Sequence, residues 1–270
     1  MKIHPTSVVS PDVEIGPDVE IGPYCLIQGK GKIGKGTFVE GHVTLGYRNG
    51  VIVIGENNHF SPGAVIGGPP QDISYKGEET SLIIGNNNTF REFSTVNLAT
   101  SKADKKTEIG NNCYIMAYAH IGHDCKLGDN VIMANNSQLG GHCEIESNVV
   151  ISAMCGLNQF TRVGRGSFLA GGSVVNKDIP PFVRAEGHWA LVRATNKIGL
   201  IRRGFARDEA NNVHKAVRIL VMGKGTVDEN IERIRAECTP SENIEHFIHF
   251  VKSSKRGIAI ARNQKEVSDE

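Results

Sequence analysis

Aliphatic residues recur at every sixth position through most of the chain between Ile3 and Val175. The longest uninterrupted run has twelve apolar residues at this one spacing. Its members are Ile109, Ile115, Ile121, Leu127, Met133, Leu139, Ile145, Ile151, Leu157, Val163, Leu169 and Val175. A period of six fits neither an α-helix, which repeats every 3.6 residues, nor the alternation of an ordinary strand. The spacing therefore predicts a short strand followed by a bend, repeated along the chain.

The residues between the aliphatic positions indicate how the chain bends. Glycine often follows the aliphatic residue, and pairs such as Asn57-Asn58 and Asn111-Asn112 suit bends that need a positive φ. Three such units would close a triangular coil, and coils stacked about 4.8 Å apart would form a parallel β-helix. The pattern resembles the hexapeptide-repeat superfamily. That resemblance implies a left-handed coil.

Two stretches lack the six-residue repeat and are predicted to be loops that leave the coils. They cover residues 67–81 and residues 97–108. Loops on a rigid scaffold often carry functional residues, and the first of these contains Gln71 and Asp72. The last ~15 residues of the chain are predicted to be a frayed end.

The apolar period becomes helical in the last part of the chain. Thr226 and Glu229 have the spacing of a capping box, and Ser241 stands where it could cap a further helix. We therefore predict a mainly β protein with two parts. A left-handed parallel β-helix of hexapeptide repeats covers residues 1–187, and a C-terminal α-helical domain covers residues 188–270.

Composition sharpens this division, because the two regions differ in glycine content and in charge. Residues 1–180 contain 25 of the 31 glycines and carry 14 Lys+Arg against 17 Asp+Glu. Residues 181–270 carry 16 Lys+Arg against 12 Asp+Glu. The formal charge of the whole chain is only +1, which argues against a protein that coats nucleic acid.

Two features bear on the cell compartment. The chain begins without the apolar run of a signal peptide, and it has no stretch of about 18 apolar residues that could cross a membrane. Five cysteines, which are Cys25, Cys113, Cys125, Cys143 and Cys155, occupy the small position four residues after the aliphatic one. They are predicted to be small buried thiols in a reduced chain. We expect a cytoplasmic protein with no membrane insertion.

The densest group of ionisable residues in the repeat contains His120, His123 and Asp124. Gly141 follows His123 by three repeats, which make up one predicted coil, and His142 comes directly after it. Three interpretations are open for this group. It could be a set of exposed polar turns, or a zinc site as in the γ-class carbonic anhydrases. It could also be a general base supported by a carboxylate.

Longer motifs resemble one family within the superfamily. They are PQDISYKGE (70–78), AHIGHDC (119–125), ANNSQLGGH (134–142), NQF (158–160) and RRGF (202–205). Together they are similar to the UDP-N-acetylglucosamine O-acyltransferases of lipid A biosynthesis. The resemblance implies transfer of a 3-hydroxyacyl group from acyl carrier protein to the 3-position of UDP-GlcNAc, the first step of that pathway.

The resemblance also implies roles for individual residues. His123 would be the catalytic base, Asp124 would support its imidazolium, and the Gly141 N–H would stabilise the oxyanion. The remaining substrate-binding positions are Gln71, Asp72, His120, His142, Gln159, Gly171, Asn196, Arg202 and Arg203. It implies a homotrimer with active sites between subunits, an acidic carrier protein and a UDP-sugar as partners, and no metal or redox cofactor.

Departures from the family pattern leave some properties open. Ser74, Asn158 and Ile198 stand where lysine, histidine and glutamate are common, so the acceptor could be a 3-hydroxyl or a 3-amino group. Gly171 falls on the position that measures acyl length, and the length is not predicted. The alternatives are another hexapeptide-repeat acyltransferase with a CoA donor, or a metal enzyme similar to γ-class carbonic anhydrase.

Overall fold

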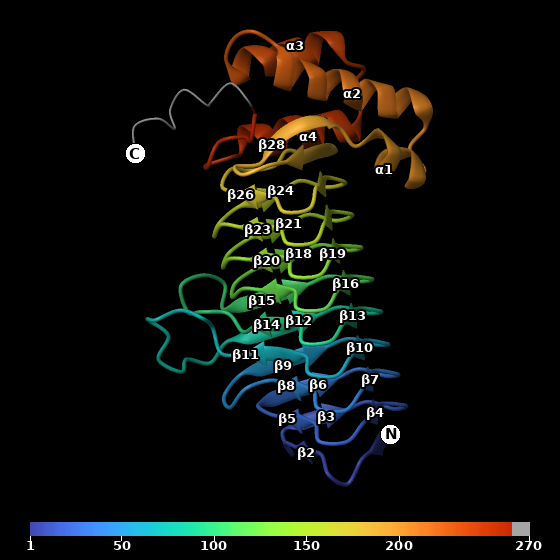
Figure 1. Cartoon of the computed structure of the whole chain (residues 1–270), viewed down its shortest axis with the longest axis vertical. Helices are drawn as coiled ribbons and strands as arrows, with labels where there is room; N and C mark the ends of the chain where they lie inside the picture. Colours follow the sequence, from blue (N-terminus) through green and yellow to red (C-terminus); the bar gives the residue numbers. More distant parts are fainter. Residues whose placement is uncertain (261–270) are drawn as a thin grey trace.

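Short parallel strands stack into three sheets that form the sides of a triangular prism (Figure 1). The computed structural model describes residues 1–260. Sheet A contains β1 (Lys2–Ile3), β4 (Glu20–Ile21), β7 (Phe38–Val39), β10 (His59–Phe60), β13 (Thr89–Phe90), β16 (Tyr114–Ile115), β19 (Ile132–Met133), β22 (Val150–Ile151), β25 (Phe168–Leu169), β27 (Val183–Glu186) and β28 (Leu191–Thr195). The chain passes from sheet A to sheet B to sheet C in every coil.

Sheets B and C complete the prism. Sheet B contains β2 (Val8–Val9), β5 (Leu26–Ile27), β8 (Thr44–Leu45), β11 (Val65–Gly68), β14 (Thr95–Asn97), β17 (His120–Ile121), β20 (Gln138–Leu139), β23 (Gly156–Leu157) and β26 (Val174–Val175). Sheet C contains β3 (Val13–Ile15), β6 (Lys30–Ile33), β9 (Val51–Ile54), β12 (Ser81–Ile84), β15 (Lys106–Ile109), β18 (Lys126–Leu127), β21 (Glu144–Ile145) and β24 (Arg162–Val163).

The six-residue repeat produces this prism because only one residue per unit points inward. In the two-residue strands from β4 onward the second residue is buried and the first faces outward, as in β17 and β20. Most corners are turned by a residue with positive φ, such as Asn112 (φ 55°) or Asp124 (φ 61°). Such a turn suits Asn and Asp, whose short polar side chains tolerate the left-handed conformation. The predicted parallel β-helix is therefore confirmed.

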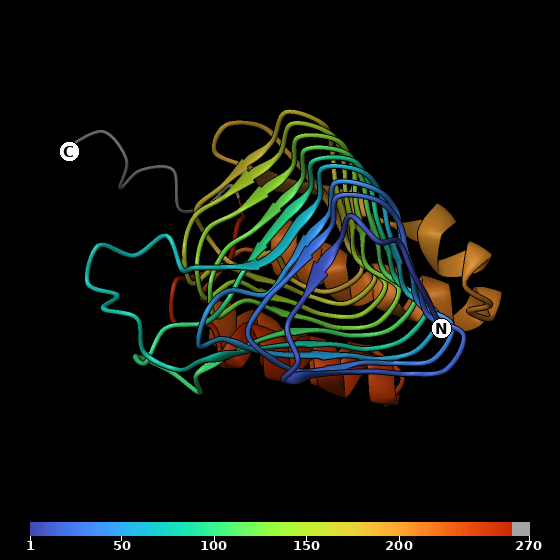
Figure 2. The ribbon, with the colours of Figure 1, turned by 90° about the horizontal axis from the view of Figure 1, so that it is seen from below.

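All three corners repeat along the prism, but only one of them carries long insertions. The segments between β11 and β12 and between β14 and β15 both leave from the corner that joins sheet B to sheet C, which we call the B/C corner. Viewed along the axis, both loops project from the same vertex of the triangle (Figure 2). The turn between β17 and β18, which contains His123 and Asp124, belongs to this corner as well.

The upper end of the prism is closed by a hairpin and four helices. The predicted boundary at residues 187 and 188 falls in the turn between β27 and β28, and β28 still pairs with sheet A in antiparallel fashion. The helices are α1 (Lys197–Arg202), α2 (Arg207–Met222), α3 (Val227–Glu237) and α4 (Glu242–Lys252). The predicted caps are confirmed, because Thr226 and Glu229 form a capping box and Ser241 accepts from Ile244 N–H.

The chain after α4 differs from the frayed end that we predicted. Residues 258–260 are buried, and Asp178 and Gly257 are hydrogen-bonded through their backbones at 2.9 Å. Apolar burial of Ile258 and these ladder bonds hold the segment on the top coil. Residues 261–270, to which the same prediction applied, lie outside the described part.

Two further predictions can be compared with the fold. The five cysteines predicted to be small buried thiols are free and buried, and Cys238 is too. Among residues 1–260, no helix has the length and apolar character needed to cross a membrane.

Candidate active site

His123 and Asp124 occupy the B/C corner immediately after β17. Both residues are only 5% exposed, and they lie beside the two long loops. His123 Nδ1 and Asp124 Oδ2 are 2.8 Å apart. The positive φ of Asp124 turns the chain so that neighbouring side chains in the sequence can form this contact. The corner thus holds a buried imidazole–carboxylate pair.

The Asp124 carboxylate is fixed by the second loop. Thr100 donates to Asp124 Oδ2 from its backbone N–H at 3.0 Å and from its hydroxyl at 2.8 Å. Thr107 accepts from the Asp124 backbone N–H at 2.9 Å and so holds the turn. Burial raises the pKa of the Asp124 carboxyl, but the hydrogen bonds from His123 and Thr100 outweigh it and keep the pKa below its usual value. Asp124 is therefore ionised at neutral pH.

An ionised Asp124 determines which nitrogen of His123 can act as a base. A carboxylate only accepts hydrogen bonds, so His123 Nδ1 carries the proton of the shared bond. The Nε2 atom then has a free lone pair, and it accepts no hydrogen bond from any residue between 1 and 260. The pair has the geometry of a general base whose ring is oriented by a carboxylate.

Gly141 lies one coil above His123 and is close to the Nε2 side of the ring. A Cβ atom at position 141 would fall 2.6 Å from His123 Nε2 and 2.5 Å from Cε1, which is shorter than any normal contact. Glycine is therefore needed here for the imidazole to occupy its place. The Gly141 N–H has no acceptor within the described structure, so it remains available for a ligand.

Two more histidines surround the pair. His142 makes an edge contact with the His123 ring, stacks on Phe160 with ring centroids 4.5 Å apart, and has Nε2 3.6 Å from Asp124 Oδ2. His120 Nδ1 lies 2.7 Å from the hydroxyl of Thr95. Burial lowers the pKa of both imidazoles, which keeps them neutral. Neutral imidazoles can accept as well as donate hydrogen bonds.

The base opens onto a cavity of about 310 Å³ on the sheet B side of the corner. This cavity brings together five of the residues predicted for the site. Asn158, which stands where histidine is common, also lines it. The five are Gln71, His120, His123, Gly141 and Gln159. Asn97 and Gln138 add amide groups that sequence reasoning did not identify. The lining offers amide and imidazole groups and contains no carboxylate, lysine or arginine, which suits an uncharged polar ligand such as a sugar.

Asp72 is held near this cavity by contacts between the two loops. Lys102 from the second loop lies 2.7 Å from Asp72 Oδ2, and Ser74 donates to Oδ1 from both its backbone and its hydroxyl. The hydrogen bonds from Lys102 and Ser74 hold the pKa of Asp72 well below its usual range. Ser74 stands where lysine is common in the family pattern. In this chain Lys102 supplies a cation beside Asp72 instead.

Four predicted site residues lie elsewhere in the single chain. Gly171 lies on the corner between sheets A and B, at the turn from β25 to β26. Asn196 caps α1 and donates to the Gly166 carbonyl at 2.9 Å, on the corner between sheets C and A. Arg202 is the last residue of α1, and Arg203 follows it. One subunit therefore does not bring these residues to His123.

Sequence reasoning missed Thr100, Lys102 and Phe160. Phe160 could have been found by counting, because it follows His142 by one regular coil of three repeats and has the same turn position. Thr100 and Lys102 lie in a loop, where counting in repeats no longer works. The loop adds residues to its coil, so that Thr95 pairs with His120, which is farther along the chain than one regular coil. Only the position of the loop at this corner brings Thr100 to Asp124.

One group in the described structure lies close enough to hold a metal ion, and it belongs to the same corner. One ligand atom from each of His123, Asp124 and His142 fits within 4.8 Å. Asp124 Oδ2, however, already accepts from His123 and from both donors of Thr100. A metal bound through Asp124 Oδ2 would compete with the hydrogen bonds that orient the His123 ring.

The ionised state of Asp124 leads to a prediction about acid stability. Because its folded pKa is lowered, the contribution of Asp124 is fully present above about pH 4 and is lost as the pH falls through the folded pKa. An Asp124→Asn variant lacks this titration and should lose less unfolding free energy than the wild type between about pH 4.5 and pH 2. Urea denaturation followed by circular dichroism measures both losses. Equal losses would contradict the assigned pKa shift.

Comparison with known proteins places this site in a family. The description "Udp N-acetylglucosamine O-acyltransferase; Domain 2" matches residues 178–259, and "Bacterial transferase hexapeptide (six repeats)" matches residues 106–141. The acyl-[acyl-carrier-protein]–UDP-N-acetylglucosamine O-acyltransferase of Thermodesulfovibrio yellowstonii is 43% identical, over 95% of this chain and 98% of its own. The enzyme of that name from Campylobacter lari is 40% identical, over 97% and 98%.

Solved structures agree with this grouping. The UDP-N-acetylglucosamine acyltransferase of Francisella novicida superposes with a TM-score of 0.92 at 35% identity, covering 99% of this chain and 97% of its own. The corresponding protein of Bacteroides fragilis has a TM-score of 0.90 at 36% identity, covering 95% and 99%. With this identity over nearly the whole length, the chain belongs to the UDP-N-acetylglucosamine O-acyltransferase family.

Proposed function

We propose that this protein transfers an acyl group from acyl carrier protein to the 3-hydroxyl of UDP-N-acetylglucosamine, the first step of lipid A biosynthesis. The observation that carries the proposal is the buried His123–Asp124 pair, whose free Nε2 faces the backbone of Gly141. Relatives that match nearly the whole chain are named for this activity. The cavity beside the base offers amide and imidazole groups that suit a sugar.

The geometry supports direct transfer without a covalent enzyme intermediate. His123 Nε2 takes the proton of the sugar hydroxyl as its oxygen attacks the thioester carbonyl. The imidazolium that forms is stabilised by Asp124, whose carboxylate stays ionised. Collapse of the tetrahedral intermediate breaks the C–S bond, and His123 returns its proton to the thiolate. The products are the sugar ester and the free thiol of the carrier.

Gly141 is placed to stabilise the developing oxyanion. Its N–H has no acceptor within the described structure and lies beside His123, where the attacking group would be bound. A preorganised donor of this type typically contributes a factor of about 10²–10³ to the rate. No metal or redox cofactor is part of this proposal, since a base, an oxyanion donor and a reactive thioester suffice for acyl transfer.

The faces of the prism support the proposed homotrimer. The outward residues of sheet B carry no formal charge along the described strands: they are Val8, Leu26, Thr44, Val65, Thr95, His120, Gln138, Gly156 and Val174. The corner between sheets A and B exposes Tyr24, Phe93, Tyr118 and Met154. The outward residues of the upper strands of sheet C are instead Glu108, Lys126, Glu144 and Arg162. The outward residues of sheet A from β13 to β25 carry no formal charge either. Sheets A and B are therefore suited to bury against other subunits, and sheet C is suited to face water.

A trimer would also bring the separated site residues together. Asn196, Arg202 and Arg203 lie on the corner between sheets C and A, whereas His123 lies on the B/C corner. If sheet B of one subunit faces sheet A of the next, these two corners meet. Burial lowers the pKa of the Arg203 guanidinium. Its Nη1 has no partner in the described structure, so it has N–H donors left for a substrate phosphate.

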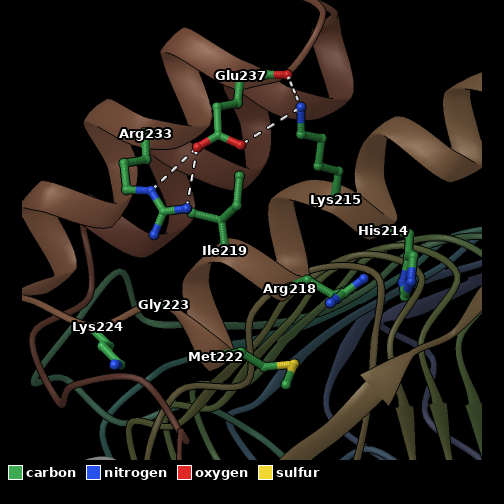
Figure 3. Close-up of a pocket in the computed structure, with 9 residues that line it drawn as sticks. All are labelled: His214, Lys215, Arg218, Ile219, Met222, Gly223, Lys224, Arg233 and Glu237. Carbon is green, nitrogen blue, oxygen red and sulfur yellow. Dashed lines mark hydrogen bonds and ion pairs between the residues drawn. The ribbon is translucent and has the colours of Figure 1, made fainter.

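The C-terminal domain offers a basic surface to an acidic carrier protein. A groove of about 500 Å³ between α2 and α3 is lined by four Lys and Arg side chains, one histidine and one acidic side chain (Figure 3). Glu237 is engaged by Lys215 and Arg233, which leaves Arg218 and Lys224 without a carboxylate partner among residues 1–260. Together with the exposed Arg202, these cations favour a negatively charged partner through long-range attraction.

The proposed activity predicts a specific effect of removing the base. His123→Ala should keep the fold and oligomeric state and lower kcat by about 10²–10⁴-fold, because general-base catalysis is lost. The assay follows formation of the acylated UDP-sugar by mass spectrometry, with acyl carrier protein and CoA thioesters compared as donors. A correctly assembled variant with a near-wild-type rate would refute the role of His123, and a preference for CoA would refute the donor.

The proposed trimer predicts different effects for two matched substitutions in one coil. Val65→Lys places a charge on the outward face of sheet B and should convert the trimer to smaller species at micromolar concentration. Val53→Lys places the same charge on sheet C and should leave the trimer intact. Light scattering after size exclusion measures both masses. A trimeric Val65→Lys protein would contradict this arrangement.

A further inference from the structure

A second cavity adjoins the catalytic corner on the side of sheet C. It has a volume of about 440 Å³ and extends from His142 and Phe160 up to the end of α4. The chain segment that follows α4 contributes Lys255 and Arg256 to its lining. His142 lines this cavity and makes an edge contact with the His123 ring, so the cavity begins one side chain away from the base.

The cavity has an excess of unpaired positive charge. Glu144 is paired with Arg162, with Oε2 and Nε 3.4 Å apart. Asp178 accepts from the Arg162 backbone at 2.9 Å and from the Ser254 hydroxyl at 2.7 Å, and it is buried. Within residues 1–260, neither Lys255 nor Arg256 has a carboxylate within ion-pair distance. Two cations thus remain for a ligand.

Arg256 is held in place by carbonyl groups and not by an acid. Its Nε donates to the Asn176 carbonyl at 3.1 Å, and Nη1 donates to the Gln159 carbonyl at 2.9 Å. The following residue, Gly257, is tied to Asp178 through the backbone at 2.9 Å. Two of the five guanidinium N–H groups are used, so the others can bind an anion without loss of the side chain's position.

The height of Arg256 above the base identifies which substrate could reach it. Gln159 and Asn176 belong to the second and third coils above His123, which is roughly 10–14 Å along the prism. The sulfur and phosphorus of a phosphopantetheine arm are separated by about 13 bonds, or on the order of 16 Å when extended. In a UDP-sugar the first phosphate is only about five bonds from the 3-oxygen, or roughly 6 Å. The arm of the donor fits the distance better.

We propose that Lys255 and Arg256 bind the phosphate of the phosphopantetheine arm and so position the thioester at His123. This inference rests on the proposed acyl transfer from a carrier protein. It gives the segment after α4 a role in binding the donor, and it places the arm along the B/C corner from the C-terminal domain down to the base. The two residues are positioning residues, because they would touch the donor far from the reacting carbon.

The test compares small donors that differ only in the phosphate. Acyl-phosphopantetheine and acyl-pantetheine are offered to the wild type, to Lys255→Gln, to Arg256→Gln and to the double variant. The wild type should prefer the phosphorylated donor in kcat/KM by about tenfold or more, and the double variant should lose that preference. The KM for UDP-N-acetylglucosamine should stay the same. Arg256→Lys, which keeps a cation, should recover part of the preference.

Controls separate the possible outcomes. Lys252→Gln removes a neighbouring charge that does not line the cavity, and it should retain the wild-type preference. An unchanged preference in the double variant would overturn the inference while leaving the acyl transfer intact. A higher KM for the UDP-sugar alone would overturn it in favour of the diphosphate as ligand. Failure of the wild type to acylate the sugar with any donor would instead refute the proposed function.

Discussion

The in-register pairing of successive coils is the constraint on which the rest of this structure depends. Because each strand pairs in parallel with the strand one coil away, residues separated by three repeats, such as His120 and Gln138, lie side by side. The spacing of about 4.8 Å between coils is too short for most side chains to be rearranged freely. His123 and Gly141 are neighbours for this reason, and a methyl group at Gly141 would already collide with the imidazole.

At the B/C corner, two loops interrupt the regular coils beside His123 and Asp124. A plain coil would leave the Asp124 carboxylate buried without enough donors, which is energetically unfavourable. The second loop supplies Thr100, which donates twice to Asp124 Oδ2, and Lys102 and Asp72 form an ion pair between the two loops. The loops are thus part of the site and not tolerated insertions on its surface. Their removal would leave the ladder of strands intact but would remove the two Thr100 donors that, with His123, keep Asp124 ionised.

The parts of the site that could be predicted from sequence are those governed by the repeat. Gly141 and Gln159 follow His123 by one and two coils, and both line the cavity as counting alone suggests. Thr100 and Lys102 could not be predicted, because a loop has no period. The same reason applies to Arg256, which was assigned to a frayed end although Ile258 is buried on the top coil. The resemblance to the family assigned Asn196 and Arg203 to the site. The sequence alone does not show that they lie on a different corner of the prism from His123.

The central claim is that one active site combines the B/C corner of one subunit with the corner between sheets C and A of the next. Mixed trimers test it directly. His123→Ala and Arg203→Ala proteins, each inactive alone, are unfolded together in equal amounts and refolded. Random assembly leaves about a quarter of the sites with both residues intact if they come from different subunits. The account predicts recovery of about a quarter of wild-type activity. No recovery, from mixed trimers verified by mass, would contradict it.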